Sequence, residues 1–593
     1  MKTYRVGLLL DGTDQPGWIH DMAEWLARSQ DCDLAALLVM EKAVPEPRLG
    51  AKALFGTLSR LESRLLPARQ RQMLACRDLR EGLPASTPVL TLPGDPRDAG
   101  RDDGVAALGL DLVLMLGALP PLPPLRARMA DWARLGVWRL GYSDIAAATS
   151  RYAGFWEVYQ RQDHTTVKLW RVGAGEDEDT LLDQRSFNTE VFWLKNQTRA
   201  FSLGNFMVYD ALLALARARP GVAPPGMQIL SGQRRADPAE WDSAAYIARQ
   251  AWLMTDLIVR RVMGRNVRWR IGMFPSVRQQ AVVSEAMVLQ PPKGRFFADP
   301  FVYTRDEHPY IFFEDYDFNS RKGTIAVATY EDGAFRLLGT ALNLPYHLSF
   351  PYIFEYEGVT YMVPETCGNR SIELWKCTEF PLKWELDMTL MTDVSAVDTI
   401  IFKRGEYWWL LTNIDRTDGQ NHCDELFAFF ADSPRSTQWT PHACNPIVRN
   451  PMRARNAGIV VSPAGEVIRC AQYQGFCHYG KGVSLNRIEE LSPSTYVETD
   501  GEIHYASFLR KRHASMHHWH HQGGAYGIRL RLYGVNDAAV IENKNVTYIS
   551  IAVFRPGLNV SMETYGQACV PIRPFIAIRA SLRGGARSGL SAA

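Results

Sequence analysis

A short unit recurs in the second half of the 593-residue chain, and this recurrence restricts the possible folds more than any other feature. In each copy an apolar run is followed by a turn and a second apolar run, which is the pattern of a β-hairpin. The first runs begin at Ala298, Ser349, Val397 and Asn456. The second runs read YIFFED, YMVPET, YWWLLTN and VIRCAQ. We therefore predict a domain assembled from repeated antiparallel strands.

The spacing of the copies indicates the kind of repeat. Successive copies are 51, 48 and 59 residues apart, counted at Pro300, Pro351, Thr399 and Gly458. This is close to the roughly 40 to 50 residues of a β-propeller blade, and a solenoid is disfavoured because every unit is β. A fifth blade, built after Ser507 and from strands near Arg270, would close a ring without open edges. The sequence predicts an all-β five-bladed β-propeller over residues 285–560.

The first 215 residues have a different pattern. The runs RVGLLL, LAALLVM and LDLVLML alternate with helical stretches such as WIHDMAEWLARS, and this alternation favours an α/β, Rossmann-like domain with a parallel sheet. Residues 216–284 read as a helical linker region, because apolar residues recur there at helical spacing. Residues 575–593 are rich in Gly, Ser and Arg, and we expect them to be disordered.

Composition excludes several classes of function. The 66 Lys and Arg residues balance 64 Asp and Glu residues, so the chain offers no broad basic surface to nucleic acid. The nine cysteines form no CxxC pair, no secretory signal opens the chain, and the apolar run that Pro120 ends is too short to span a membrane. We expect a cytoplasmic protein without a transmembrane segment. No GxGxxG motif follows the first strand, and no cofactor is predicted.

Polar residues fall at corresponding positions of the repeat. In a propeller the first strand of each blade lines the central channel, and Asp299 and Asp398 stand where such strands begin. The second strand returns to the same end of the channel. Its last residues include Glu314, Asp315, Glu365, Asn413 and Gln472. We therefore expect carboxylates from several blades to converge at one end of the channel.

Convergent carboxylates are what glycosidic chemistry needs. One carboxyl group protonates the leaving oxygen, and another acts as base or nucleophile on the opposite side of the sugar. We predict that Asp299, Glu365 and Asp398 are catalytic. The alternative is that each aspartate caps a turn, which short carboxylates often do. Turn capping does not explain why three blades carry acidic groups at equivalent positions.

Further residues are predicted to bind substrate, because cationic and aromatic groups stack on sugars or hold phosphates. They are Glu314, His347, Arg455, Gln472, His518 and Trp519. The last two belong to the run Met516 to His521. Strand alternation would split its four histidines between two faces, and no acidic or thiol ligand has a fixed spacing to them. No metal site is predicted.

Several motifs between about residues 290 and 500 resemble one family. They are FFADPFVY, YIFFED, HLSFPYIFEYEGVTYMVPET, VDTIIFKRGEYWWLLTN, and RNAG with IRCAQYQ. They resemble the N-terminal domain of plant glucosamine inositolphosphorylceramide transferase, which also occurs in bacterial proteins. The resemblance implies a propeller similar to those of arabinanases, levansucrases and invertases, whose sites use an Asp on the first blade and carboxylates on later ones. It makes Asp299 the leading base or nucleophile. Transfer in the plant protein is generally assigned to a separate C-terminal domain, so the reaction is less firmly implied.

The segments GVW from Gly136, RYAGFWEV from Arg151 and TVKL from Thr166 resemble the formyltransferase family over about residues 1–215. That family uses an Asn and a His two residues apart and a distant Asp. Here these positions read Arg139, Gly141 and Asp177. The resemblance thus implies a degenerate site and a domain that serves as scaffold or binding module.

Three functions follow as hypotheses. The first is a carbohydrate-active enzyme that acts on a glycosidic or sugar-phosphate linkage, by glycosyl transfer or hydrolysis, in surface glycan or glycolipid biosynthesis. Its substrate would be a sugar, a nucleotide sugar or a glycolipid. The second is a propeller that binds a glycan without catalysis. The third is a formyltransferase acting on an amino sugar, which the substitutions at Arg139 and Gly141 disfavour.

Overall fold

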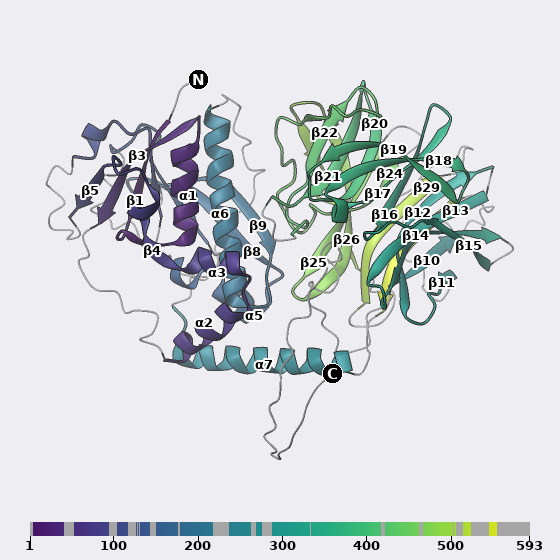
Figure 1. Cartoon of the computed structure of the whole chain (residues 1–593), viewed down its shortest axis with the longest axis horizontal. Helices are drawn as coiled ribbons and strands as arrows, with labels where there is room; N and C mark the ends of the chain where they lie inside the picture. Colours follow the sequence, from purple (N-terminus) through teal and green to yellow (C-terminus); the bar gives the residue numbers. More distant parts are fainter. Residues whose placement is uncertain are drawn as a thin grey trace, which may run out of the picture.

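The computed structural model of the chain contains an α/β half and an all-β half (Figure 1). It describes residues 4–40, 53–93, 104–116, 126, 129, 131–142, 150–175, 178–216, 237–262, 269–275, 287–306, 308–331, 334–416, 421–461, 466–501, 503–505, 514–523 and 545–553. The predicted disordered tail, 575–593, lies outside these residues.

The N-terminal half is built on a seven-stranded sheet in the order β5-β3-β1-β6-β7-β8-β9. Its first five strands are parallel, as the alternating pattern predicts, while β8 and β9 add an antiparallel edge. The strands are β1 (Tyr4–Leu10), β3 (Cys32–Met40), β5 (Val89–Leu92), β6 (Leu112–Met115), β7 (Val137–Gly141), β8 (His164–Arg171) and β9 (Thr180–Asn188). Strand β1 is apolar from Val6 to Leu10, where both of its faces are covered.

The two faces of this sheet pack against different segments. On one face, Leu8 and Leu10 share a core with Trp18 of α1 and Phe201 of α6, whereas Leu9 belongs to a core with Trp132 on the other face. The helices are α1 (Gly17–Arg28), α2 (Ala53–Leu65), α3 (Ala68–Leu74), α5 (Phe155–Gln160), α6 (Trp193–Ala216) and α7 (Glu240–Val262). Short pieces are β2 (Asp14–Pro16), β4 (Cys76–Asp78) and 3₁₀ turns at Leu79–Gly82, Ala106–Leu108, Ser150–Tyr152 and Cys367–Asn369.

The C-terminal half has a propeller-like arrangement. Three antiparallel sheets each contain four consecutive strands, β12 to β15, β16 to β19 and β20 to β23. These strands are β12 (Arg295–Arg305), β13 (His308–Asp317), β14 (Lys322–Glu331), β15 (Ala334–Leu342), β16 (Ser349–Tyr356), β17 (Val359–Glu365), β18 (Ser371–Glu379), β19 (Lys383–Thr392), β20 (Ala396–Arg404), β21 (Tyr407–Ile414), β22 (Phe427–Ala431) and β23 (Thr440–Pro441).

A larger sheet joins both ends of this half in the order β11-β10-β30-β29-β24-β25-β26-β27, with β28 paired to β26. Its strands are β10 (Trp269–Pro275), β11 (Met287–Leu289), β24 (Asn456–Val461), β25 (Val467–Gly475), β26 (His478–Leu491), β27 (Tyr496–Glu498), β28 (Ile503–Tyr505), β29 (Ala514–Gly523) and β30 (Asn545–Val553). The predicted helical linker, 216–284, therefore contains α7 but also strand β10. Strands β12, β16, β20, β24 and β29 contact one another in a closed cycle.

A bulge interrupts the first strand of each repeated unit at the same place. Pairing with the second strand shifts after Ala298, Ser349, Val397 and Asn456. At the bulges φ is positive: 48° at Asp299, 44° at Phe350, 51° at Asp398 and 111° at Gly458. Aspartate and glycine tolerate this left-handed region better than most residues. Since a bulge redirects the side chains at its position, it sets where these residues point.

The two halves are joined by buried ion pairs. Arg185 of β9 contacts Asp210 of α6 at 2.7 Å and Glu425 of the propeller half at 3.2 Å. Arg416 closes the network, at 3.0 Å from Asp210 and 2.7 Å from Glu425. Arg185 is 2% exposed. Because buried charges need partners, this network fixes the N-terminal half against the propeller half.

Candidate functional site

Four carboxylates come together from three neighbouring sheets. Asp299 and Asp398 lie in the bulges of β12 and β20, while Glu314 and Glu365 lie on β13 and β17, the second strands. Glu314 pairs with Ala298 and Glu365 with Ser349, so each sits beside a bulge. All four are buried. We call Asp299, Glu314, Glu365 and Asp398 the carboxylate cluster.

The members of the cluster act on one another electrostatically. Burial raises the pKa of Glu314 well above its usual value, and the charges of Asp299, Glu365, Asp315 and Asp398 raise it further. Burial likewise raises the pKa of Glu365 well above its usual value, with Asp398 as the next cause. Like charges at close range cannot all be ionised at once. The structure therefore holds carboxylic acids and carboxylates side by side, and it brings the three predicted catalytic residues together.

Arg455 contacts the cluster from the start of β24. Its Nε donates to Asp398 Oδ2 at 2.6 Å, and its guanidinium lies 5.6 Å from the ring centre of Tyr479. Nη1 points to the sulfur of Cys423 at 3.7 Å. A positive charge at this distance favours the ionised form of a carboxyl group. Arg455 therefore favours the ionised form of Asp398.

Two buried histidines border the cluster. His347 Nδ1 accepts from the Gly323 amide at 2.9 Å, so the proton of the neutral ring is on Nε2, 3.6 Å from Glu314 Oε1. Burial lowers the pKa of His347 to about 4 and keeps the ring neutral. His518 Nδ1 lies 3.7 Å from Asp299 Oδ1. Its ring packs edge-on against Phe301 and Phe350, which fixes its orientation.

Other predicted residues have structural contacts instead. Gln472 donates to the carbonyl of Asn456 and accepts from Gln474, within its own sheet. The Asn413 amide donates to two backbone carbonyls, those of Glu425 and Ala454.

Asp315 and Trp519 are also singled out by the sequence, and the structure places them as follows. Asp315 pairs with Arg295 at 2.9 Å, and burial raises its pKa to about 6. Trp519 lies on β29, where its backbone pairs with Ile549, but its side chain is outside the described part of the structure.

The sequence pattern does not reveal several residues around the site. Tyr479 lies near the start of β26, on the strand after Gln472, and its ring faces Arg455. Cys367, Ser395 and His422 follow or precede strands in irregular segments, and His422 Nε2 lies 3.0 Å from Ser395 Oγ. Cys367 is also among the groups that raise the pKa of Glu365. Only the repeat period gives a signal here, and these residues do not follow it.

Within the residues that the structure describes, no group of three His, Cys, Asp or Glu side chains is arranged to hold a metal ion. Among the described helices, none is both long and apolar enough to cross a membrane.

Of the predicted formyltransferase positions, Arg139 belongs to an ion-pair network. Arg139 contacts Asp179 at 3.0 Å, and Arg126 contacts the same carboxylate at 2.7 Å. Gly141 pairs with Lys168 in the sheet. Asp177 lies outside the described residues. The degenerate site thus remains a prediction, and Arg139 is held by an acidic partner.

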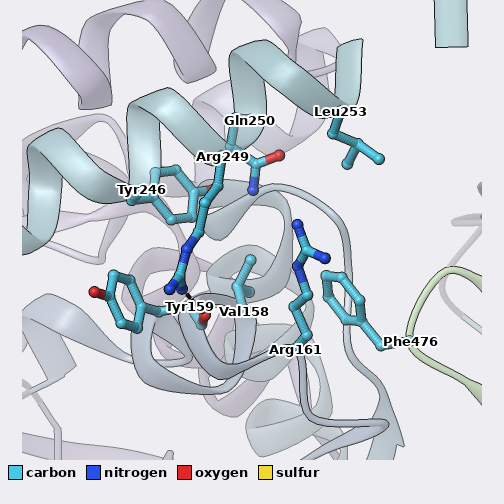
Figure 2. Close-up of a pocket in the computed structure, with 8 residues that line it drawn as sticks. All are labelled: Val158, Tyr159, Arg161, Tyr246, Arg249, Gln250, Leu253 and Phe476. Carbon is cyan, nitrogen blue, oxygen red and sulfur yellow. Dashed lines mark hydrogen bonds between the residues drawn. The ribbon is translucent and has the colours of Figure 1, made fainter. Parts of the chain in front are cut away.

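A small hollow lies mainly between α5 and α7, with Phe476 of the propeller half at its edge (Figure 2). It is lined by Val158, Tyr159, Arg161, Tyr246, Arg249, Gln250, Leu253 and Phe476. Arg249 donates to the Tyr159 carbonyl at 2.8 Å and covers the ring of the same residue. None of the carboxylate cluster lines this hollow, so it is not the glycosidic site expected from the sequence.

Comparison with known proteins confirms the resemblance of the propeller half. The family model described as glucosamine inositolphosphorylceramide transferase 1, N-terminal, matches residues 277–546. The rice (Oryza sativa subsp. japonica) glucosamine inositolphosphorylceramide transferase 1 is 34% identical over 209 residues, 35% of this chain and 28% of the relative. The Arabidopsis thaliana protein of the same name is 34% identical over 212 residues, 35% of this chain and 27% of the relative. The chain thus spans little more than a quarter of these relatives.

Solved structures give slight likenesses to both halves. A thermostable family-43 glycoside hydrolase has a TM-score of 0.28 at 15% identity, over 35% of this chain and 75% of its own. A formyltetrahydrofolate deformylase from Pseudomonas syringae pv. tomato has a TM-score of 0.24 at 13% identity, over 37% of this chain and 63% of its own.

Proposed function

We propose that the carboxylate cluster is the active site of a carbohydrate-active enzyme that makes or breaks a glycosidic or sugar-phosphate linkage in glycolipid synthesis. The observation that carries this proposal is the burial of four carboxyl groups from three sheets beside one another. The match to glucosamine inositolphosphorylceramide transferases supports the substrate class, a sugar, nucleotide sugar or glycolipid. We further propose that β29, β30, β10 and β11 form a fifth blade.

The electrostatics of the cluster divide the roles. Glu365 retains its proton because its pKa is raised, so it gives that proton to the leaving oxygen as the bond to the sugar breaks. Asp299 takes the proton of the attacking hydroxyl group or water. Asp398, which accepts from Arg455, stabilises the positive charge that develops on the sugar ring. Glu314 supports Asp299 from the neighbouring strand.

A purely structural role for the cluster is disfavoured on energetic grounds. Each buried carboxyl group loses hydration, and its neighbours repel its ionised form. Arg455 contacts Asp398 directly, yet burial and the neighbouring carboxylates still raise the pKa of Glu314 and of Glu365. Proteins maintain such costly arrangements mainly at functional sites, where perturbed pKa values serve proton transfer.

The test is incubation of the protein with nucleotide sugars and glycosides, with consumption measured by mass spectrometry. Asp299→Asn should fold normally and lose at least about 100-fold in rate, because removing a general base typically costs 10² to 10⁴. Asp306→Asn is the matched control, since Asp306 also has positive φ, 51°, and lies on the exposed turn after β12. It should retain the wild-type rate.

Two outcomes would contradict the proposal. Equal turnover by wild type and Asp299→Asn would exclude the assigned base. Stoichiometric glycan binding without product would identify the propeller half as a binding module. Circular dichroism of each variant verifies that it is folded.

A further inference from the structure

Helix α7 exposes its apolar side chains. Trp241 is 69% exposed, Trp252 60%, Ile258 59% and Val259 47%. In Figure 1, α7 runs along the lower edge of the molecule, beneath the N-terminal half and toward the propeller half. Soluble proteins rarely leave two tryptophans and several aliphatic side chains together on one helix without a partner.

The exposed side chains share one face of the helix. At 100° per residue, the outward face is formed by Trp241, Ala244, Ala248, Ala251, Trp252, Thr255, Ile258 and Val259. We call these eight residues the α7 outer face. Within the described helix, Glu240 is the one charged residue at these angles; it lies at the edge of the face, at the same angle as Ile258, and accepts from the Leu54 amide. A surface helix normally has many charges on its outward side, whereas this side of α7 is mainly apolar.

The polar residues of α7 are used on its inner side. Asp242 accepts from the Ala239 amide, and Arg249 donates to the Tyr159 carbonyl. Tyr246 and Leu253 are buried and line the hollow between α5 and α7, as Figure 2 shows. The helix is therefore fixed in orientation, and rotation about its axis cannot hide the outer face.

Helix α2 adds apolar and basic groups next to α7. The two helices are joined by hydrogen bonds from the Leu54 amide to Glu240 and from the Tyr246 hydroxyl to Glu62. Leu61 and Leu65 are 51% and 57% exposed. Exposed arginines on α2 and α3 are Arg60, Arg64, Arg69 and Arg71. The acidic residue of α2, Glu62, is buried. The exposed charge of α2 and α3 themselves is therefore positive.

We propose that the α7 outer face and the adjoining α2 dock on an anionic lipid surface. The face is one helix wide and about 34 Å long, which suits a helix lying in the plane of a membrane interface. Tryptophan side chains prefer that interface, and arginines beside them attract anionic headgroups. The inference does not depend on the proposed reaction, although a lipid surface is where a glycolipid substrate resides.

The experiment measures sedimentation of the full chain with vesicles of phosphatidylcholine alone or with 30% phosphatidylglycerol. The wild type should bind the anionic vesicles, and added salt should weaken that binding. Trp241→Ser with Trp252→Ser should lower the affinity at least about tenfold, because two large apolar side chains no longer enter the interface. Leu337→Ser with Leu386→Ser, exposed at 52% and 49% on the propeller half, should bind like wild type.

A second variant tests the charge contribution. Arg60→Gln with Arg64→Gln should weaken binding to anionic vesicles and leave unfolding unchanged, because both side chains are exposed. Asp299→Asn should bind as wild type, which separates docking from turnover.

Several outcomes would overturn the proposal. Failure of the wild-type protein to sediment with anionic vesicles would exclude a lipid surface as the partner. Equal binding by the tryptophan variant would exclude this face. A wild-type dimer in light scattering that the tryptophan variant dissociates would assign the face to a second copy of the chain.

Discussion

At the scale of single residues, the cluster places acids with unequal proton affinities beside one another. Glu314 and Glu365 hold their protons because burial and neighbouring carboxylates oppose ionisation. Asp398 has the Arg455 guanidinium at 2.6 Å, which favours its ionised form. These unequal environments are what the proposed reaction needs from a proton donor and a carboxylate at the same pH.

This arrangement predicts a stability cost that depends on pH. The pKa of Glu314 is higher in the native than in the unfolded chain, so between these two values the native state binds more protons. The free energy of unfolding must then fall as pH rises through that window. Glu314→Gln cannot ionise and avoids the loss. Its advantage over wild type at pH 8 should be about 1.4 kcal/mol for each unit of raised pKa.

Urea unfolding of wild type and Glu314→Gln between pH 4 and 9 measures this difference. The two curves should meet at low pH and separate as pH rises. Parallel curves over the whole range would contradict the raised pKa. The conservative exchange keeps the volume of the side chain, so packing changes do not mask the result.

At the scale of elements, the repeated bulge determines the site. The repeat predicts Asp299 and Asp398 at the starts of first strands, whereas the structure places them at bulges, Asp299 well inside β12. The second-strand ends that carry Glu314 and Glu365 are as predicted. These positions are predictable because side chains alternate along a strand and the second strand of a hairpin runs back beside the first, and both rules depend only on nearby sequence. Gln472 obeys the same rules, yet its amide is occupied by the Asn456 carbonyl. Whether a polar side chain is free for substrate or bonded within its own sheet depends on tertiary contacts, which the repeat pattern does not predict.

Other parts of the structure could not be predicted from the sequence for the same reason. Tyr479 and His422 reach the site from segments outside the repeat, so their placement depends on the tertiary structure. Strand β10 falls in the predicted linker because its partner β30 lies far along the sequence. The parallel order of the N-terminal strands, by contrast, follows from local alternation and is confirmed.

The hairpin between β16 and β17 offers a test of turn chemistry. Its central residues, Glu357 and Gly358, have φ of 51° and 73°, which is the geometry of a two-residue turn that favours Asn-Gly. Glu357→Asn should stabilise the protein by about 0.5 to 1 kcal/mol, since asparagine adopts positive φ at lower cost. Thermal unfolding measures the gain. Glu357→Ala is the control and should be no more stable than wild type.

At the scale of the whole molecule, buried ion pairs tie the two halves together. Removing Asp210 would leave Arg185 and Arg416 with one acidic partner fewer, and Arg185 is almost fully buried. Asp210→Ala should cost about 3 kcal/mol and separate the unfolding of the two halves, because an uncompensated buried charge is expensive. Differential scanning calorimetry would show two transitions where the wild type has them coupled.

An exposed ion pair is the control for this prediction. Glu385→Ala removes the partner of Lys376, and both side chains are at least one third exposed. Its cost should stay below about 1 kcal/mol. Similar losses for Asp210→Ala and Glu385→Ala would contradict a buried coupling between the halves.

Strand β10 pairs with β30, and β29 contacts both β24 and β12. A ribosome delivers β10 long before β30, so the nascent chain carries unpaired strand edges until residue 553 has emerged. Open edges recruit other strands, and slow closure prolongs the hazard. Strands β29 and β30, the last ones in the described part of the chain, thus close the ring, and translation speed over the residues before them sets how long the edges stay unpaired.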